Sequence, residues 1–153
     1  MKMSLVEAPF SNDFLPEFGS ATKVIFGSAA DQSWLDALTW RLQKMPDVTV
    51  FVVKSDNGVA AYKAGYAIAY DRYYSWLGGV RPQYRRQGLG KQLMDAQHEW
   101  LKGSRFQLLE THVEQKNRAM IQLNLNSGFA ATGEFMKGGD PYAVMQKVLN
   151  APR

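Results

Sequence analysis

The sequence contains no cysteine, and this absence excludes several kinds of chemistry at once. Disulfides, thiolate nucleophiles and thiolate metal sites all require that residue. No hydrophobic run approaches the ~20 residues that a membrane-spanning helix needs. Residues 1–10 also lack the apolar core of a signal peptide. We therefore expect a soluble, cytoplasmic protein that has no membrane partner.

A dense acidic cluster is also missing, and the chain carries a formal net charge of +4. Such a basic balance raises the question of nucleic-acid binding. The basic residues are scattered, however, apart from one group formed by Arg81, Arg85, Arg86 and Lys91. We expect this group to bind a small anion and expect no nucleic-acid partner.

The length and the pattern of elements indicate one domain, residues 1–153, which is long enough to bury a core without disulfides. Residues 1–20 show no clear period and are predicted to form an N-terminal arm. Strands are predicted at 22–27, 48–54, 59–71, 73–80, 106–113, 132–136 and 142–148, and helices at 31–45, 89–101 and 118–127. This alternation predicts an α+β domain, in which helices flank a mixed sheet.

A basic, glycine-containing loop joins the predicted strand at 73–80 to the predicted helix at 89–101. Glycine lets a backbone come close to a ligand. The first amides of a helix have no partner within the helix and can bind phosphate oxygens. The loop therefore predicts a pyrophosphate site, formed by Arg85, Arg86, Gln87, Gly88, Leu89, Gly90 and Lys91.

Two common phosphate motifs do not fit this loop. A Walker A loop needs a glycine where Arg85 stands and a serine or threonine where Gln92 stands. A dinucleotide fingerprint needs a third glycine where Leu93 stands. The pattern that remains is Arg/Gln-x-x-Gly-x-Gly, preceded by the strand exit Val80-Arg81-Pro82.

In this context the loop resembles the signature loop of the GNAT superfamily of acyl-CoA N-acyltransferases. A second matching segment runs from Asn117 to the pair Gly128-Phe129. The resemblance covers roughly residues 48–148, and residues 1–47 match only in their coarse pattern. It implies a GNAT-like three-layer fold with a mostly antiparallel central sheet. That sheet would splay open between the strand before the loop and the strand after its helix, leaving a wedge for acyl-CoA.

The resemblance also implies a coenzyme site and a direct reaction. Acetyl-CoA would be the co-substrate, without a metal, and the loop together with Val80 would bind the coenzyme. Asn117 matches the asparagine that contacts the pantetheine or phosphate region in the family. It is equally suited to cap a helix, and both roles are compatible. Without cysteine there is no acyl-cysteine intermediate, so the acyl group would pass straight from donor to acceptor.

Acyl transfer to an amine needs a polarised carbonyl and a deprotonated amine. The strand end at Gly79 is predicted to polarise the carbonyl through a backbone amide. A lysine-like amine has a pKa near ~10.4, so its neutral form costs ~4.6 kcal/mol to reach at pH 7. The two-residue period of strand 106–113 places Leu108, Glu110 and His112 on one face. Glu110 is the first candidate for the base and His112 the second; the alternative is that Glu110 is a structural acid near the sheet end.

The departing thiolate needs a proton or a hydrogen bond, and here the chain departs from the family. A tyrosine usually stands four residues before the glycine of the Gly-Phe pair, and this chain has Asn124 there. An asparagine amide can donate a hydrogen bond to sulfur, but it cannot act as a proton donor. It is also suited to bond a carbonyl in the core. Tyr73, Tyr74 and Tyr142 are the candidate donors that the sequence leaves unplaced.

The acceptor is less readable, although the first half of the chain is rich in aromatic residues that suit a small or amino-acid-like amine with an apolar part. Our leading hypothesis is an acetyl-CoA-dependent N-acetyltransferase that acts on a primary amine of a small molecule, amino acid or peptide. The alternatives are a non-catalytic acyl-CoA-binding or regulatory module, favoured by Asn124, and a basic nucleic-acid-binding domain. The oligomeric state stays open, a homodimer included.

Overall fold

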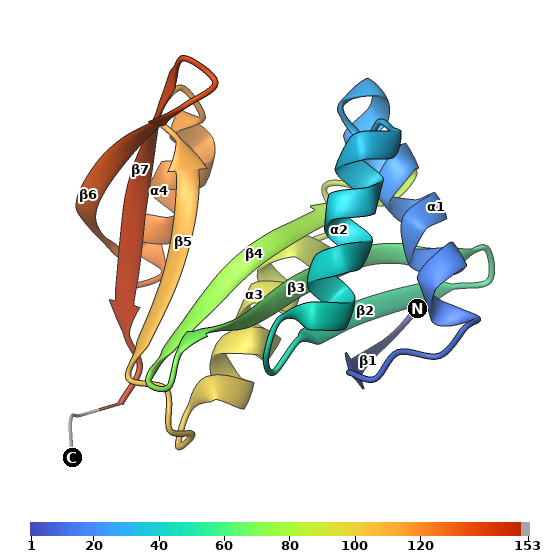
Figure 1. The fold of residues 1–153 in the computed structure, drawn as a ribbon, viewed down its shortest axis with the longest axis horizontal. Helices are drawn as coiled ribbons and strands as arrows, with labels where there is room; N and C mark the ends of the chain where they lie inside the picture. The colour runs from blue at the N-terminus through green and yellow to red at the C-terminus, as the bar shows by residue number, and fades with distance from the viewer. Residues whose placement is uncertain (151–153) are drawn as a thin grey trace.

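A single seven-stranded sheet runs through the computed structural model, which describes residues 1–150 (Figure 1). Its strand order is β1-β2-β3-β4-β5-β7-β6. Every neighbouring pair is antiparallel except β4 and β5, which are parallel. The strands are β1 (Lys2–Glu7), β2 (Thr49–Ser55), β3 (Gly58–Ala69), β4 (Arg72–Val80), β5 (Leu108–Glu114), β6 (Ala130–Lys137) and β7 (Asp140–Val148).

Helices cover both faces of this sheet, so the molecule has three layers. The helices α1 and α2 lie on one face, and α3 and α4 on the other (Figure 1). Their bounds are α1 (Phe14–Phe26), α2 (Gln32–Lys44), α3 (Leu89–Leu101) and α4 (Arg118–Asn126), and short 3-10 turns occupy Gly27–Ala29 and Pro82–Tyr84. The predicted α+β class and the three-layer arrangement are confirmed.

The core lies between these layers on both sides of β3. On the α1 side, the rings of Phe18 and Tyr62 pack at a tilt of 53° with centroids 4.4 Å apart, and Thr22 shares a 2.9 Å hydrogen bond with the Tyr62 hydroxyl. On the α3 side, Leu93 and Leu101 are buried against the sheet. Burial of large apolar side chains on both faces fixes the sheet between its helices.

The predictions for the N-terminal region are wrong. Residues 1–20 are not an arm, because β1 pairs with β2 along its length and α1 begins at Phe14. The predicted strand at 22–27 is the end of α1. Its β-prone side chains suggested a strand, but Phe14 and Phe18 are buried at helical spacing, and their packing decides the local structure.

Most later elements lie where the sequence predicts them. Helix α3 has the predicted bounds, and a turn at Asp56 and Asn57 joins β2 to β3, which begins at Gly58 with φ 96°. The strands β5 to β7 and the helix α4 differ from the prediction by one or two residues at their ends. Such shifts are ordinary for element boundaries.

The sheet splays open between β4 and β5. These strands pair only at Arg72↔Leu108, Tyr73↔Leu109 and Tyr74↔Glu110. The Thr111 hydroxyl then donates a 3.1 Å hydrogen bond to the Ser75 carbonyl. Beyond this point the two strands diverge (Figure 1). The predicted wedge is therefore present, with its apex at Ser75.

Gly65, which lies in β3 opposite the wedge apex, leaves no room for a side chain. A Cβ atom there would sit 2.5 Å from Tyr73 Cε2 and 2.7 Å from the Tyr74 carbonyl oxygen. We expect Gly65→Ala to lower the free energy of unfolding by ~1–3 kcal/mol, since the backbone of β4 cannot retreat. Chemical denaturation measures this, with Gly133→Ala as the control because its Cβ would meet nothing closer than 3.8 Å. Equal stability of the two variants would contradict the expectation.

Candidate active site

The loop between β4 and α3 is anchored to the end of the sheet by side chains. Arg81 Nε donates to the Val59 carbonyl at 2.5 Å, and Arg85 Nε donates to the Val80 carbonyl at 3.0 Å. A 3.0 Å hydrogen bond joins the hydroxyl of Tyr84 to that of Ser55 on β2. These contacts hold the predicted phosphate loop at the open end of the wedge.

The start of α3 exposes backbone amides that no side chain caps. Gly88 is the N-cap residue, in the left-handed region at φ 77°, and Arg86 is also left-handed at φ 64°. By contrast, Asp31 caps α2 by accepting a 2.9 Å hydrogen bond from the Trp34 amide. The first amides of α3 are thus left for a ligand. Successive amides around such a turn form a concave site for an anion.

Three loop residues differ in what they add to this site. The side chain of Leu89 is buried and holds the helix start on the sheet. Gly90 has open space where a Cβ would be. Lys91 is exposed and forms a 2.7 Å ion pair with Asp95, one turn further along α3. Its ammonium therefore already has a partner.

A cavity of about 270 Å³ lies in the wedge between β4 and β5. The Ser75 hydroxyl oxygen is buried there and has no hydrogen-bond partner within residues 1–150. A buried polar atom without a protein partner is available to hydrogen-bond a group bound in the cavity. The walls include Lys63, Ser75, Trp76, Leu77, Gly78, Met94, His98, Thr111, His112, Val113, Glu114, Asn117, Met120, Asn124 and Phe129.

The strand register decides which amides of β4 face this wedge. The Arg81 amide donates to the Ala60 carbonyl of β3 at 2.9 Å. Because alternate residues of a strand point their amides to the same edge, the Gly79 amide also faces β3. The amides of Gly78 and Val80 face the wedge. Gly79 is a glycine for another reason, since its Cβ would clash with Ile25 of α1.

Glu110 and His112 lie on one face of β5, as the two-residue period predicts. Their side chains share a 3.0 Å hydrogen bond between Glu110 Oε2 and His112 Nε2. Gln146 Nε2 donates to the other carboxylate oxygen at 2.8 Å, and Arg72 lies 3.9 Å from that same oxygen. Glu110 is thus a buried carboxylate whose orientation is fixed by neighbouring strands.

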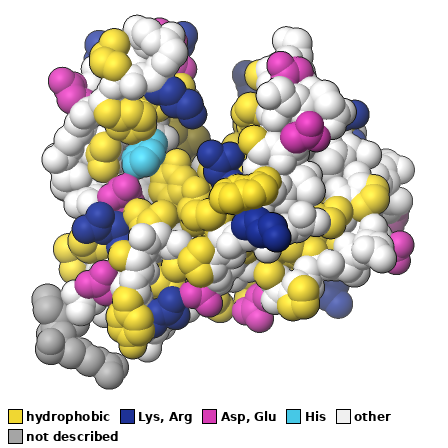
Figure 2. Space-filling view, in the orientation of Figure 1, with side chains coloured by type: hydrophobic (Ala, Val, Ile, Leu, Met, Phe, Trp, Pro, Cys, Tyr) yellow, Lys and Arg dark blue, Asp and Glu magenta, His cyan; other side chains and the backbone are white. Residues whose placement is uncertain are grey.

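A second cavity, of about 590 Å³, opens on the opposite face of the sheet and contains the Glu110–His112 pair. Figure 2 shows this hollow, with a histidine beside hydrophobic side chains and Lys or Arg side chains around it. Aromatic rings in contact form its wall, with centroids 4.8 to 5.5 Å apart: Trp76, Tyr66, Tyr74, His112, Phe135 and Tyr142. Burial raises the pKa of Tyr74 to about 12.

Asn124 is buried and lines the wedge cavity. Its amide nitrogen lies 3.7 Å from Met145 Sδ. No tyrosine joins it among the cavity's described lining residues. The hydroxyl of Tyr73 is bonded to Thr49 and to a backbone carbonyl, and Tyr74 and Tyr142 line the other cavity.

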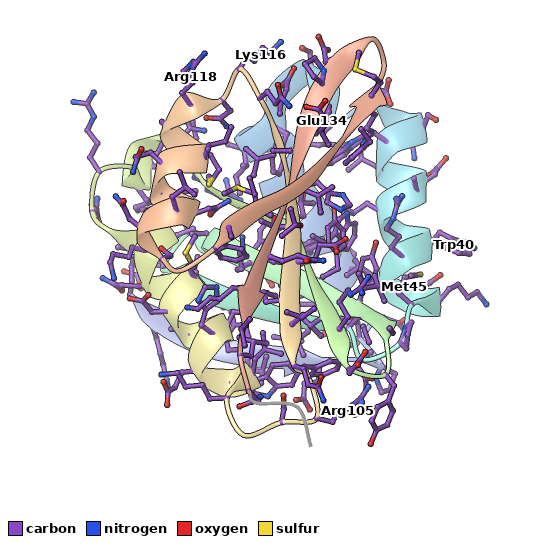
Figure 3. All side chains as sticks on the ribbon, turned by 90° about the vertical axis from the view of Figure 1, so that its left-hand side faces the viewer. Trp40, Met45, Arg105, Lys116, Arg118 and Glu134 are labelled. Atoms are coloured by element: carbon purple, nitrogen blue, oxygen red, sulfur yellow. The ribbon has the colours of Figure 1, made fainter. Side chains whose placement is uncertain are left out.

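Asn117 lies where it can both cap a helix and contact a ligand in the wedge, the two roles that the sequence suggested for it. Its side chain accepts a 3.3 Å hydrogen bond from the Met120 amide and so caps α4. It also lines the wedge cavity. Its neighbours Lys116 and Arg118 extend outward at the start of α4 (Figure 3).

Sequence reasoning missed a group of basic side chains behind the wedge. Lys63 on β3 lines the cavity, and burial lowers the pKa of Lys63 to about 8. His98 is also buried. Its pKa is lowered to about 4, chiefly by burial and to a smaller extent by the charges of Lys147 and Lys63. Lys147 Nζ lies 3.0 Å from His98 Nδ1. The available signal was a lysine within the otherwise apolar strand β3.

Within residues 1–150, no three His, Asp or Glu side chains gather in a way that would hold a metal ion. No helix in this part of the chain is both long and apolar enough to cross a membrane.

The family model described as "Acetyltransferase (GNAT) family" matches residues 12–129. The chain belongs to the GNAT acetyltransferase family. GNAT membership agrees with the loop motif and with the wedge, and the family uses acetyl-CoA. No protein of curated function matches the chain in sequence.

Solved structures share the GNAT fold at low sequence identity. The ribosomal-protein-S18-alanine N-acetyltransferase of Escherichia coli superposes with a TM-score of 0.80 at 16% identity, over 99% of this chain and 97% of that one. A GNAT acetyltransferase from Bacillus cereus gives 0.71 at 19% identity, over 99% and 100%. The PaiA N-acetyltransferase of Thermoplasma acidophilum, in complex with coenzyme A, gives 0.67 at 14%, over 97% and 99%. These likenesses establish the fold.

Proposed function

We propose that this protein is an acetyl-CoA-dependent N-acetyltransferase that moves the acetyl group directly to a primary amine. One observation carries the proposal. The wedge cavity and the aromatic cavity lie on opposite faces of the sheet and share Trp76, Leu77 and His112 in their walls. A donor held in the first and an acceptor held in the second meet between β4 and β5.

The coenzyme would be bound mainly by backbone groups. The amides around Gly88 and Gly90 would bind the pyrophosphate, with Arg85, Arg86, Gln87, Leu89 and Lys91 completing the loop. A helix N-terminus favours an anion by roughly 0.3–1 kcal/mol, up to ~2 when partly buried. The Val80 amide, Asn117 and Asn124 line the path of the pantetheine arm, and the unpartnered Ser75 hydroxyl lies at its end.

Carbonyl polarisation is assigned to the Gly78 amide in place of Gly79. The Gly79 amide belongs to the ladder with β3, whereas the Gly78 amide faces the wedge. One such donor is typically worth ~2.7–4 kcal/mol of barrier height. A backbone amide in a strand is preorganised for this role because its direction is fixed by the sheet.

Amine deprotonation is assigned to Glu110, with His112 as its partner. Glu110 faces the acceptor cavity, and His112 lines both cavities. Their 3.0 Å hydrogen bond gives the proton a route from the amine toward solvent. A base here offsets the ~4.6 kcal/mol that deprotonation of a lysine-like amine costs at pH 7.

The acceptor cavity favours an amine that carries an apolar part and a carboxylate. Its walls are mostly aromatic and aliphatic, and Glu110 is its only carboxylate among the described lining residues. Two cations stand at its ends: Arg41 Cζ lies 5.7 Å from the Trp76 ring centre, and Lys137 Nζ lies 5.8 Å from that of Tyr142. This balance of charge suits an amino acid better than a polyamine.

An amine panel tests the function. We expect acetyl-CoA and phenylalanine to give N-acetylphenylalanine, identified by mass, with release of one thiol per turnover. Phenylalaninamide should react more slowly, because it lacks the carboxylate, and spermidine should react slowest. If the protein binds acetyl-CoA but acetylates no amine, the proposal fails and the non-catalytic acyl-CoA-binding module becomes the better account.

A further inference from the structure

Lys63 lies in the middle of β3, and its side chain lines the wedge cavity, which is an unusual position for a lysine. Its neighbour Tyr62 points toward α1, and Lys63 points to the opposite face, toward α3. Its stem passes under Gly78, where an added Cβ would lie only 2.9 Å from Lys63 Cδ. Gly78 is thus the residue that leaves room for Lys63 to reach the wedge.

No acidic side chain of the described residues forms an ion pair with Lys63. Burial alone accounts for the lowered pKa of Lys63, and no acidic residue of the described chain offsets it. The titratable groups that share the cavity wall are His98 from α3 and His112 and Glu114 from β5, while Lys147 of β7 approaches from behind His98. Glu114 is itself paired with Lys116 at 2.9 Å. An uncompensated cation in a cleft destabilises the fold and indicates a functional group.

The chemistry of the wedge requires a proton donor near the thioester. When the amine nitrogen bonds to the acetyl carbon, the carbon–sulfur bond breaks and the sulfur retains the electron pair. A thiol has an ordinary pKa near ~8.5, so the departing thiolate takes up a proton at pH 7, and a cation or proton donor beside the sulfur stabilises the charge that develops as the bond breaks. Asn124 cannot supply that proton.

The other candidates in the cavity differ from Lys63 in charge, position or role. His112 also lines the cavity, but its ring is hydrogen-bonded to Glu110 at 3.0 Å and is assigned to amine deprotonation. His98 is almost entirely deprotonated at pH 7, because burial lowers its pKa to about 4. Tyr73, Tyr74 and Tyr142 do not line the cavity. Among the described residues that line the cavity, Lys63 alone has an ammonium group, and its pKa of about 8 leaves it mostly protonated at pH 7 while easing proton release.

We propose that Lys63 is the general acid that protonates the departing thiolate of coenzyme A. The Nζ proton passes to sulfur, giving the free thiol and a neutral lysine. Amide formation releases the protons of the amine nitrogen through Glu110 to solvent, and Lys63 regains one proton from solvent at the open wedge, so that one proton is released in each turnover of an ammonium substrate. This assignment rests on the proposed acetyltransferase function. It explains how the site works with an asparagine at position 124.

The first test measures the thiol of bound coenzyme A itself, by the ultraviolet absorbance of its thiolate as pH is raised. In the wild type the Lys63 cation should hold the thiol pKa about one unit lower than in Lys63→Met. Lys147→Met removes a neighbouring cation that does not line the cavity, and it should shift the thiol pKa by less than a third as much. Equal thiol pKa values in wild type and Lys63→Met would overturn this inference and leave the proposed acetyltransferase function in place. Failure of coenzyme A to bind the wild type would overturn the proposed function and this inference together.

The second test is kinetic. Lys63→Met should lower kcat with acetyl-CoA by about 100-fold, the lower end of what general acid catalysis supplies, and leave KM for the amine within threefold. Adding Asn124→Tyr to this variant should raise its kcat at least tenfold, since a phenol then faces the same cavity. A kcat within threefold of wild type, or a loss that Asn124→Tyr does not restore, would contradict the role.

Folding is controlled in the same experiments. Methionine replaces the lysine stem without its charge, so Lys63→Met should melt at or above the wild-type temperature. If Lys63→Met melts at a lower temperature than the wild type, Lys63→Arg replaces it in the kinetic test. The arginine retains the cation but does not release a proton, so it should keep coenzyme binding and lose kcat. Full activity of Lys63→Arg would contradict proton donation.

Discussion

Gly90→Asp should abolish coenzyme binding while leaving the fold intact. Gly90 is the second residue of α3, and nothing lies within 4 Å of the position that its Cβ would take. A carboxylate in the first turn stabilises a free helix by ~0.3–1 kcal/mol. The same negative charge would stand where the pyrophosphate is proposed to bind. We expect the affinity for acetyl-CoA to fall at least ~100-fold, or ~2.8 kcal/mol.

Calorimetry measures the expected loss of affinity for acetyl-CoA, and a thermal melt measures whether the fold is retained. Gly90→Asn is the matched control, because asparagine has nearly the same size as aspartate without the charge. Its affinity should lie between those of the wild type and Gly90→Asp. Wild-type affinity in Gly90→Asp would mean that the coenzyme does not bind at this loop.

Glu110→Gln should lower kcat by ~10²–10⁴-fold at neutral pH and leave the affinity for acetyl-CoA unchanged. Glutamine keeps the shape of the side chain and can still bond to His112 and Gln146, but it cannot take a proton from the amine. The loss should shrink as pH rises toward the pKa of the acceptor, near ~10.4 for a lysine-like amine, because the amine then deprotonates without help.

Steady-state kinetics over a range of pH tests this prediction. Glu134→Gln is the control, since Glu134 is an exposed carboxylate on β6 that accepts a 2.7 Å hydrogen bond from Gln115 and lies outside both cavities. It should keep wild-type kcat. If Glu110→Gln also retained most of its activity but lowered the melting temperature, Glu110 would be the structural acid that the sequence allowed as the alternative.

The fold was predictable where signals are local. Helix α3 has an apolar stripe and a glycine N-cap, and the strands β2 and β3 are β-prone runs separated by the short segment around Asn57, so these elements were predicted close to their observed bounds. The N-terminal region was not, because Val24 and Ile25 favour a strand in isolation. Only the packing of Phe18 on Tyr62, which lies far away in sequence, makes that segment helical.

The site was predictable to the same extent and for the same reason. The phosphate loop is contiguous in sequence, and the two-residue period correctly placed Glu110 beside His112. The direction of the Gly78 and Gly79 amides depends on the register of β3 against β4, which no local pattern contains. The presence of Lys63 and Asn124 in the wall of one cavity likewise depends on the way the sheet splays.

Acetyl-CoA binding by the wild-type protein, measured by calorimetry at two salt concentrations with ATP and NAD as controls, tests the central claim most directly. The account predicts saturable binding of acetyl-CoA, little binding of ATP or NAD, and an affinity that persists at the higher salt because backbone amides supply most of the contacts. No acetyl-CoA binding would contradict it. So would equal binding of all three ligands that is lost steeply with salt, which is the behaviour of a general polyanion site.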